Sequence, residues 1–76
     1  MPRYVTEDVL TKKFGKRVKK LRMQRGYTQE TLAIEADVSV RSIKRIETGQ
    51  IITSIAYAYR LAQGLGIPLS ELFEMD

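Results

Sequence analysis

The 76-residue sequence contains no cysteine, no histidine and no tryptophan. Without cysteine the chain has no disulfide to stabilise a small domain, and without cysteine or histidine it lacks the commonest ligands of a structural zinc ion. We therefore expect no metal site and no cofactor. General-base and nucleophile roles would fall on Lys, Asp, Glu, Ser or Tyr, and no pair of these is spaced as in a catalytic pocket. An enzymatic function is not expected.

Long apolar runs are also missing. The longest stretch without a charged residue, 48–59, is far shorter than the ~20 apolar residues that a membrane span requires. The first ten residues mix charges and lack the apolar core of a signal peptide. These absences predict a single soluble domain over residues 1–76, with an N-terminal arm at 1–6 and a helical body at 7–76, in the cytoplasm.

Charge is distributed unevenly along the chain. Residues 1–46 hold 12 Lys and Arg against 5 Asp and Glu, a net charge of 12 − 5 = +7, whereas residues 47–76 have 1 − 4 = −3. A basic N-terminal part favours a polyanionic partner such as nucleic acid. The alternative is that basic helices simply keep the chain soluble.

Apolar spacing predicts a first helix over about residues 7–25. Its apolar residues recur at intervals of four, four and three, which places on one helical face Leu10, Phe14, Val18 and Leu21. Thr6 can cap the start of this helix, and Gly26 follows its end. Eight cations surround most of its remaining circumference, which favours an amphipathic helix of a bundle over a membrane-surface helix.

Two short helices follow, separated by only two residues. Thr28 and Ser39 are suitable N-caps for them. Their expected inward residues are Leu32, Ala33, Ala36, Ile43 and Ile46. The sharp turn between them requires a residue that tolerates positive φ, and Asp37 can meet this need, less comfortably than glycine. The pattern predicts a helix-turn-helix over about residues 28–47.

A fourth helix is predicted over about residues 54–66. Ile55, Tyr57 and Tyr59 alternate as in a strand, but the longer helical pattern is favoured, with an inner face of Ile55, Tyr59, Ala62 and Leu65. Pro68 can open a last short helix, in which Leu69, Leu72 and Phe73 are expected to close the core. The predicted fold is all-α, compact and built from five helices.

The outward face of the third helix is the candidate site. If Ile43 and Ile46 point into the core, the opposite face carries Val40, Arg41, Lys44 and Arg45. Three cations and a methyl-bearing side chain suit the DNA major groove, which admits one α-helix and presents guanine acceptors and thymine methyls. The alternative is a solvated polar face on an ordinary helical bundle.

The run YTQETLAIEADVSVRSIKRIETG at 27–49, followed by YRLAQGLGIPLSELF at 59–73, resembles the lambda-repressor/Cro-like (XRE-type) helix-turn-helix DNA-binding domain. With the lead-in LRMQRG, the resemblance covers roughly residues 10–74. It implies a five-helix domain that binds double-stranded DNA, with the third helix in the major groove and the second across the backbone. A transcriptional regulator of a bacterium or phage is therefore expected.

The resemblance also implies roles for individual residues. Bases, or phosphates near them, would be contacted by Val40, Arg41, Lys44 and Arg45. Phosphates would be contacted by Thr28, Gln29, Ser39 and Ser42. Arg22 would pair with Glu47, tying the first helix to the end of the third. Such a pair would mainly fix the position of the recognition helix, since a partly buried ion pair adds little net stability.

The chain departs from the family pattern in its turn and in one loop. Asp37 stands where glycine is common, and the loop QIITS at 50–54 replaces a polar or basic loop. Since one such module buries only about 600–1,000 Å² on DNA, we expect a homodimer that reads a palindromic operator with half-sites ~34 Å apart. The candidate dimer residues are Ile51, Ile52, Ile67, Leu69 and Phe73, each of which could instead belong to the core.

These observations predict a sequence-specific, non-enzymatic regulator of transcription, associated with the nucleoid. The rival is a protein-binding module with the same fold, either an antitoxin that caps a toxin or an adapter that contacts the transcription machinery. Such a module would not require Arg41, Lys44 and Arg45 together on one exposed face. RNA is a weaker alternative, because no aromatic platform accompanies the basic residues.

Overall fold

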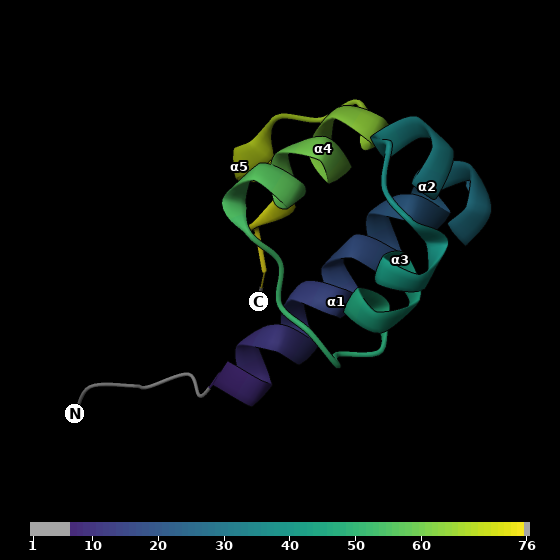
Figure 1. The fold of residues 1–76 in the computed structure, drawn as a ribbon. Helices are drawn as coiled ribbons and strands as arrows, with labels where there is room; N and C mark the ends of the chain where they lie inside the picture. Colours follow the sequence, from purple (N-terminus) through teal and green to yellow (C-terminus); the bar gives the residue numbers. More distant parts are fainter. Residues whose placement is uncertain (1–6, 76) are drawn as a thin grey trace.

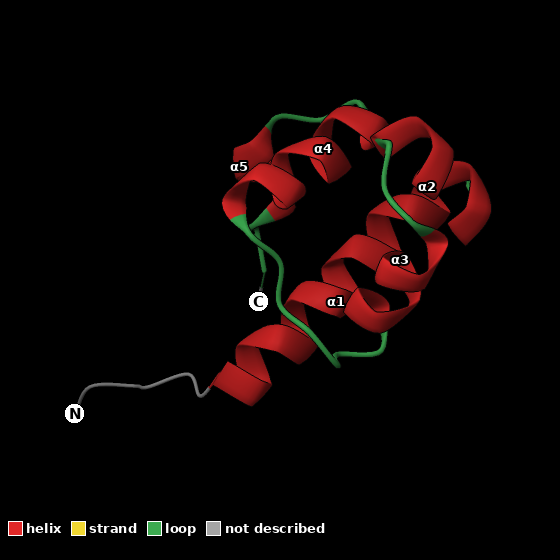
Figure 2. Ribbon diagram, in the orientation of Figure 1, coloured by secondary structure: helices red, strands yellow, loops and turns green. Residues whose placement is uncertain are grey.

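The computed structural model describes residues 7–75, and this part of the chain is folded into five helices without a strand (Figures 1 and 2). The helices are α1 (Glu7–Gln24), α2 (Gln29–Ala36), α3 (Val40–Glu47), α4 (Ile55–Leu65) and α5 (Leu69–Leu72). The predicted all-α, five-helix fold is confirmed. The predicted arm at 1–6, with its Thr6 cap, lies outside the described residues.

One hydrophobic core joins all five helices. α1 packs along α3, α2 packs against both α3 and α4, and α5 packs against α4 (Figure 1). The core consists of Phe14, Val18, Leu21, Leu32, Ala33, Ala36, Ile43, Ile46, Ala58, Leu61, Ala62, Leu65 and Leu72. Burying each large apolar side chain contributes about 1.5–3 kcal/mol. The core therefore stabilises α2 and α3, which are too short to be stable alone.

Two helix crossings occur at glycines. A Cβ atom on Gly15 of α1 would overlap the carbonyl oxygen of Ile46 in α3. A Cβ atom on Gly64 of α4 would lie 2.8 Å from the backbone nitrogen of Ala36 in α2. Because van der Waals contact requires a larger separation, only glycine allows the helix axes to approach this closely. The two glycines thereby set the positions of α3 and α2 in the bundle.

The turn between α2 and α3 has the conformation that the sequence predicted. Asp37 adopts φ 56° and ψ 50°, in the left-handed region, and its backbone N–H is directed to the carbonyl groups of Ala33 and Ile34. The N–H of Val38 donates to the carbonyl of Ala33 at 2.9 Å. These bonds end α2 and satisfy its last carbonyl groups, so that α3 can begin at Val40.

Several core predictions were wrong. Segment 55–65 is a helix, but Ile55 and Tyr59 are 69% and 51% exposed, and Ala58 and Leu61 are buried in their place. The close approach at Gly64 fixes the rotation of α4 and turns the row of Ile55 and Tyr59 outward. Leu10 is exposed as well, because it lies one turn before the part of α1 that packs in the core.

Phe73 was also expected to close the core. It follows α5 and is 40% exposed, with its ring stacked on Phe14 at a centroid distance of 5.6 Å. Pro68 precedes α5 as predicted. No helix within residues 7–75 is long and apolar enough to span a membrane.

Candidate nucleic-acid interface

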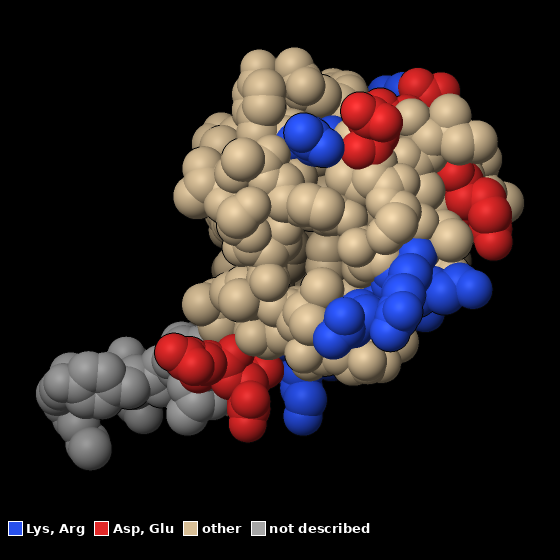
Figure 3. All heavy atoms as spheres, in the orientation of Figure 1, with Lys and Arg blue, Asp and Glu red and all other residues tan. Residues whose placement is uncertain are grey.

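α3 presents its basic residues to solvent and its isoleucines to the core. Ile43 and Ile46 are fully buried, whereas Arg41, Lys44 and Arg45 are all exposed. In the space-filling view, Lys and Arg side chains gather into one group over α3 (Figure 3). The structure therefore places three of the four predicted DNA-reading side chains on one accessible face.

Val40, the fourth, is only half-exposed. It begins α3 and packs against the hydrophobic core. The sequence periodicity alone placed it outward with the three cations, but the first turn of α3 lies close to the rest of the bundle. Any base contact by Val40 would use only part of its side chain.

Two of the three hydroxyl groups predicted to contact phosphate, those of Thr28 and Ser39, act as helix caps. Thr28 Oγ1 accepts a hydrogen bond from the backbone N–H of Thr31 at 3.0 Å, and Ser39 Oγ accepts one from that of Ser42 at 3.1 Å. Ser39 Oγ also donates to Ser42 Oγ at 2.8 Å. Thr28 and Ser39 are exposed, so the N-termini of α2 and α3 are both accessible. Such helix N-termini favour anions through their unpaired N–H groups and positive dipole ends.

The expected ion pair between Arg22 and Glu47 is present in the structure. Arg22 Nε donates to Glu47 Oε2 at 2.7 Å, and Arg22 Nη2 donates to Glu47 Oε1 at 3.1 Å. The third guanidinium nitrogen, Nη1, donates to the carbonyl of Tyr27 at 2.8 Å. The two side chains are only 11% and 2% exposed, respectively. One guanidinium group thus connects α1, the loop before α2 and the end of α3.

Gln29 takes a position that the sequence did not indicate. Its side-chain Nε2 donates to Glu47 Oε1 at 3.1 Å, so the amide is turned toward the ion pair. No sequence spacing connects positions 29 and 47, which explains why this contact was missed. Gln29 begins α2, so its backbone N–H still lies at an accessible helix N-terminus.

Two residues beyond the predicted site border its C-terminal edge. Thr48 Oγ1 donates to the carbonyl of Lys44 at 2.8 Å and lies within hydrogen-bonding distance, 2.9 Å, of Gln50 Nε2. Both residues are exposed. Position 48 continues the periodicity of 41, 44 and 45 by one step of three, and this signal could have identified Thr48 from the sequence.

The predicted dimer residues fall into two groups. Ile51, Ile67 and Leu69 are half-buried against the core, whereas Ile52 and Phe73 are 56% and 40% exposed. The exposed pair lines an apolar groove with a volume of about 180 Å³. The groove is completed by Leu10, Phe14, Thr53, Ile55 and Met75. Its residues from α1 and α4 were missed because their apolar spacing had assigned them to the core.

The sequence of this chain resembles a known family and known proteins. A helix-turn-helix family model matches residues 18–72. The chain is 37% identical over 62 residues to control protein C.MunI of a Mycoplasma species, covering 80% of this chain and 84% of that protein.

Two solved structures resemble the fold closely. The restriction-modification controller protein C.AhdI from Aeromonas hydrophila has 36% sequence identity and a TM-score of 0.80, covering 83% of this chain and 96% of that one. Wild-type restriction-modification controller protein C.Esp1396I has 29% identity and a TM-score of 0.79, covering 86% and 83%. The chain therefore belongs to the XRE-type helix-turn-helix family, as its motifs predicted, and is a DNA-binding regulator of transcription.

Proposed function

We propose that this regulator binds a palindromic operator as a homodimer, with α3 of each subunit in the major groove of one half-site. The observation that carries the proposal is how α3 is held. Its isoleucines are fully buried, its last residue is fixed by the Arg22–Glu47 pair, and its three cations are free to face DNA. A recognition helix must be positioned rigidly for its side chains to select bases.

The exposed cations suit different contacts. Arg41 and Arg45 each carry a planar guanidinium that can donate two hydrogen bonds to N7 and O6 of guanine, whereas Lys44 supplies a single flexible charge. The N-termini of α2 and α3, capped by Thr28 and Ser39, would bind backbone phosphates on either side of the groove. In this arrangement the side chains of α3 read bases, and the N-termini of α2 and α3 position the protein on the DNA backbone.

The apolar groove is the proposed dimer surface. A two-fold interface places the same groove of both copies against each other. Its residues Ile52, Ile55 and Phe73 expose apolar area that an isolated subunit leaves in water, and burying such a side chain fully contributes about 1.5–3 kcal/mol. Ile51, Ile67 and Leu69 would support the groove from the core side.

The names of two relatives suggest which genes this regulator controls. The names of C.MunI and C.AhdI describe a control protein and a restriction-modification controller. We extend that role to this chain: a non-enzymatic regulator, acting in the cytoplasm on the nucleoid, that controls transcription of restriction-modification genes. Genomic DNA retained by the purified protein should then include a promoter upstream of a DNA methyltransferase or endonuclease gene.

Selection of random duplexes tests the DNA-reading proposal. We expect a palindrome whose half-sites lie about one helical turn apart. Arg45→Ala or Arg41→Ala should relax the preference at one base pair by about 1–3 kcal/mol, while the control Arg60→Ala on α4 should leave the selected sequence unchanged. Recovery of only sequence-blind, salt-sensitive binding would contradict base reading by α3.

Sedimentation tests the dimer. Ile52→Glu places a charge in the groove and should shift the protein toward monomer, whereas Ile34→Glu, the same change at an exposed site on α2, should not. If the unaltered protein sediments as a monomer both alone and with operator, the homodimer is wrong. Stable capture of a toxin or of a transcription factor by the groove would then favour the protein-binding alternative.

A further inference from the structure

One wall of the apolar groove lies after the last helix. The groove is lined by three segments, which are α1, the start of α4 with the loop before it, and the residues after α5. In the same order, these segments contribute Leu10 and Phe14; Ile52, Thr53 and Ile55; and Phe73 and Met75. Phe73 and Met75 form the C-terminal wall of the groove. Their position therefore depends on what holds the segment after α5.

α5 gives this wall little support of its own. The helix has only four residues, and its N-cap, Pro68, makes no side-chain capping bond. A helix this short is not stable by itself. After it, the N–H of Glu74 donates to the carbonyl of Glu71 at 3.2 Å. The N–H of Met75 donates to the carbonyl of Phe73 at 2.9 Å. These local turns shape the segment, but only contacts with other helices can fix it in place.

Arg17 of α1 makes a polar contact that holds the end of α5, beside the fully buried side chain of Leu72. Its Nε and Nη2 donate to the carbonyl of Glu71 at 3.2 and 2.9 Å, although the two residues are 54 positions apart. The same carbonyl accepts the N–H of Glu74, so one oxygen atom joins α1 to the turn that leads into the wall. A guanidinium presents its donors in a rigid planar fork. The two bonds therefore fix the direction of the turn as well as its distance from α1.

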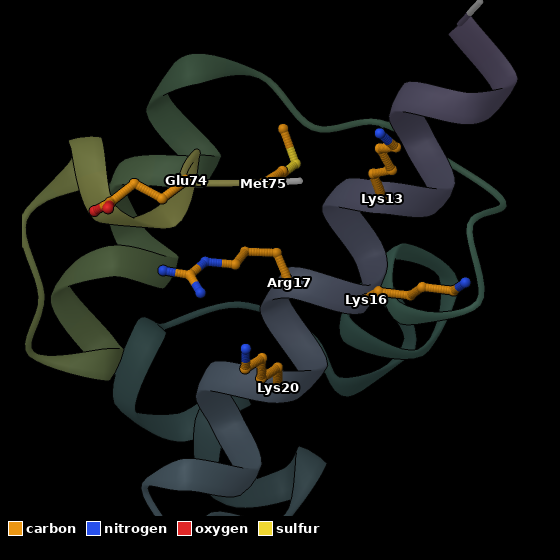
Figure 4. A pocket seen from close by; sticks show the side chains of 6 residues that line it. All are labelled: Lys13, Lys16, Arg17, Lys20, Glu74 and Met75. Carbon is orange, nitrogen blue, oxygen red and sulfur yellow. The ribbon is translucent and has the colours of Figure 1, made fainter. Parts of the chain in front are cut away.

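Packing alone does not fix the C-terminal wall. In Figure 4, Arg17 extends from α1 toward the segment that carries Glu74, beside a hollow of about 280 Å³. Met75 is half-buried against the core, yet it borders both this hollow and the apolar groove. A side chain that borders two hollows can shift more readily than one that is close-packed. The ring of Phe73, stacked on Phe14, is 40% exposed. The bonds of Arg17 thus add a restraint that the wall otherwise lacks.

We propose that Arg17 is a positioning residue of the dimer surface. Through the carbonyl of Glu71 it holds Phe73 and Met75 where a second copy of this chain packs on them. This role rests on the proposed homodimer and identifies what shapes its surface. A two-fold interface uses the same wall twice. If loss of Arg17 leaves the wall in place for about one third of the time, each subunit contributes a factor of about three, and dimerisation weakens about ninefold.

Sedimentation equilibrium of three variants tests this role. R17Q removes the forked guanidinium, R17K keeps the charge without the fork, and the control K16Q removes one charge from the neighbouring residue. In Figure 4, Lys16 extends to the opposite side of α1 from Arg17. We expect the dissociation constant of the dimer to rise about tenfold in R17Q and about threefold in R17K, and to stay within about twofold in K16Q. Circular dichroism checks that each variant is folded.

A double-mutant cycle with F73A distinguishes positioning of the wall from a general loss of stability. F73A removes one side chain of the wall and should itself weaken the dimer. Adding R17Q should then weaken it by less than about threefold, since only Met75 is left to position. The role of Arg17 is overturned if R17Q or, should R17Q not fold, R17K dimerises as the unaltered chain does. It is also overturned if K16Q weakens the dimer as much as R17Q, or if R17Q keeps its full effect in F73A. A chain that is monomeric in every form, alone and with operator, overturns the homodimer and this role together.

Discussion

Replacing Glu47 with alanine tests whether the buried ion pair positions the recognition helix. The change leaves the guanidinium of Arg22, only 11% exposed, with the carbonyl of Tyr27 as its remaining partner, and it removes the acceptor of the Gln29 amide. Removing one member of a buried pair costs about 3–5 kcal/mol. Because Arg22 keeps one hydrogen bond, we expect about 3 kcal/mol, which for a domain of this size lowers the melting temperature by roughly 12–24 °C.

A second variant distinguishes the loss of the ion pair from the cost of leaving one buried charge unpaired. In R22M/E47M neither charge remains, so the loss of stability should be less than half that of E47A, since apolar pairs of similar volume often replace buried ion pairs at little cost. Thermal unfolding followed by circular dichroism at 222 nm measures both variants. Because the Glu47 side chain is only 2% exposed, it cannot itself contact DNA.

Operator affinity, measured well below the melting temperature of each variant, then reports the position of α3. We expect E47A to bind operator at least tenfold more weakly than the unaltered chain. E47A that melts within about 2 °C of the unaltered chain and binds operator equally would show that the pair neither stabilises nor positions α3, and the reasoning would be refuted.

Three further changes test individual contacts, each by the urea midpoint. Gly15→Ala adds a Cβ that overlaps the Ile46 carbonyl and should cost about 1–3 kcal/mol; a gain of ~1 kcal/mol, as helix propensity alone predicts, would contradict the close crossing. Asp37→Gly relieves the left-handed backbone at φ 56° and should add up to about 1 kcal/mol, so a lower midpoint would argue against strain. Tyr57→Phe removes a buried hydroxyl that has no hydrogen-bond partner in the described part of the chain and should be neutral or stabilising, and a loss above ~1 kcal/mol would reveal a partner.

The helices themselves could be predicted because their signals are local. Caps at Thr28, Ser39 and Ser54 accept hydrogen bonds from residues three positions later, and such short-range chemistry is written directly in the sequence. The positive φ of Asp37 followed from the short connection between the two helices, which the structure places at residues 37–39. The exposed cations of α3 followed from the burial of Ile43 and Ile46.

Which apolar residues are buried could not be predicted with the same success. Ile55 and Tyr59 have helical spacing, as do Ala58 and Leu61, and both rows fit an amphipathic helix. The choice between them is made by contact with another helix, where Gly64 meets Ala36. The same uncertainty assigned Leu10 to the core and left the apolar groove unrecognised.

The sequence by itself determined the helical segments, the turn, the family and the outward direction of Arg41, Lys44 and Arg45, because each depends on residues close together in the chain. Only the tertiary structure decided how α3 is held, through Gly15 against Ile46 and through Glu47 shared by Arg22 and Gln29. These features depend on distances between residues far apart in sequence, which packing of the whole core sets and no local pattern encodes.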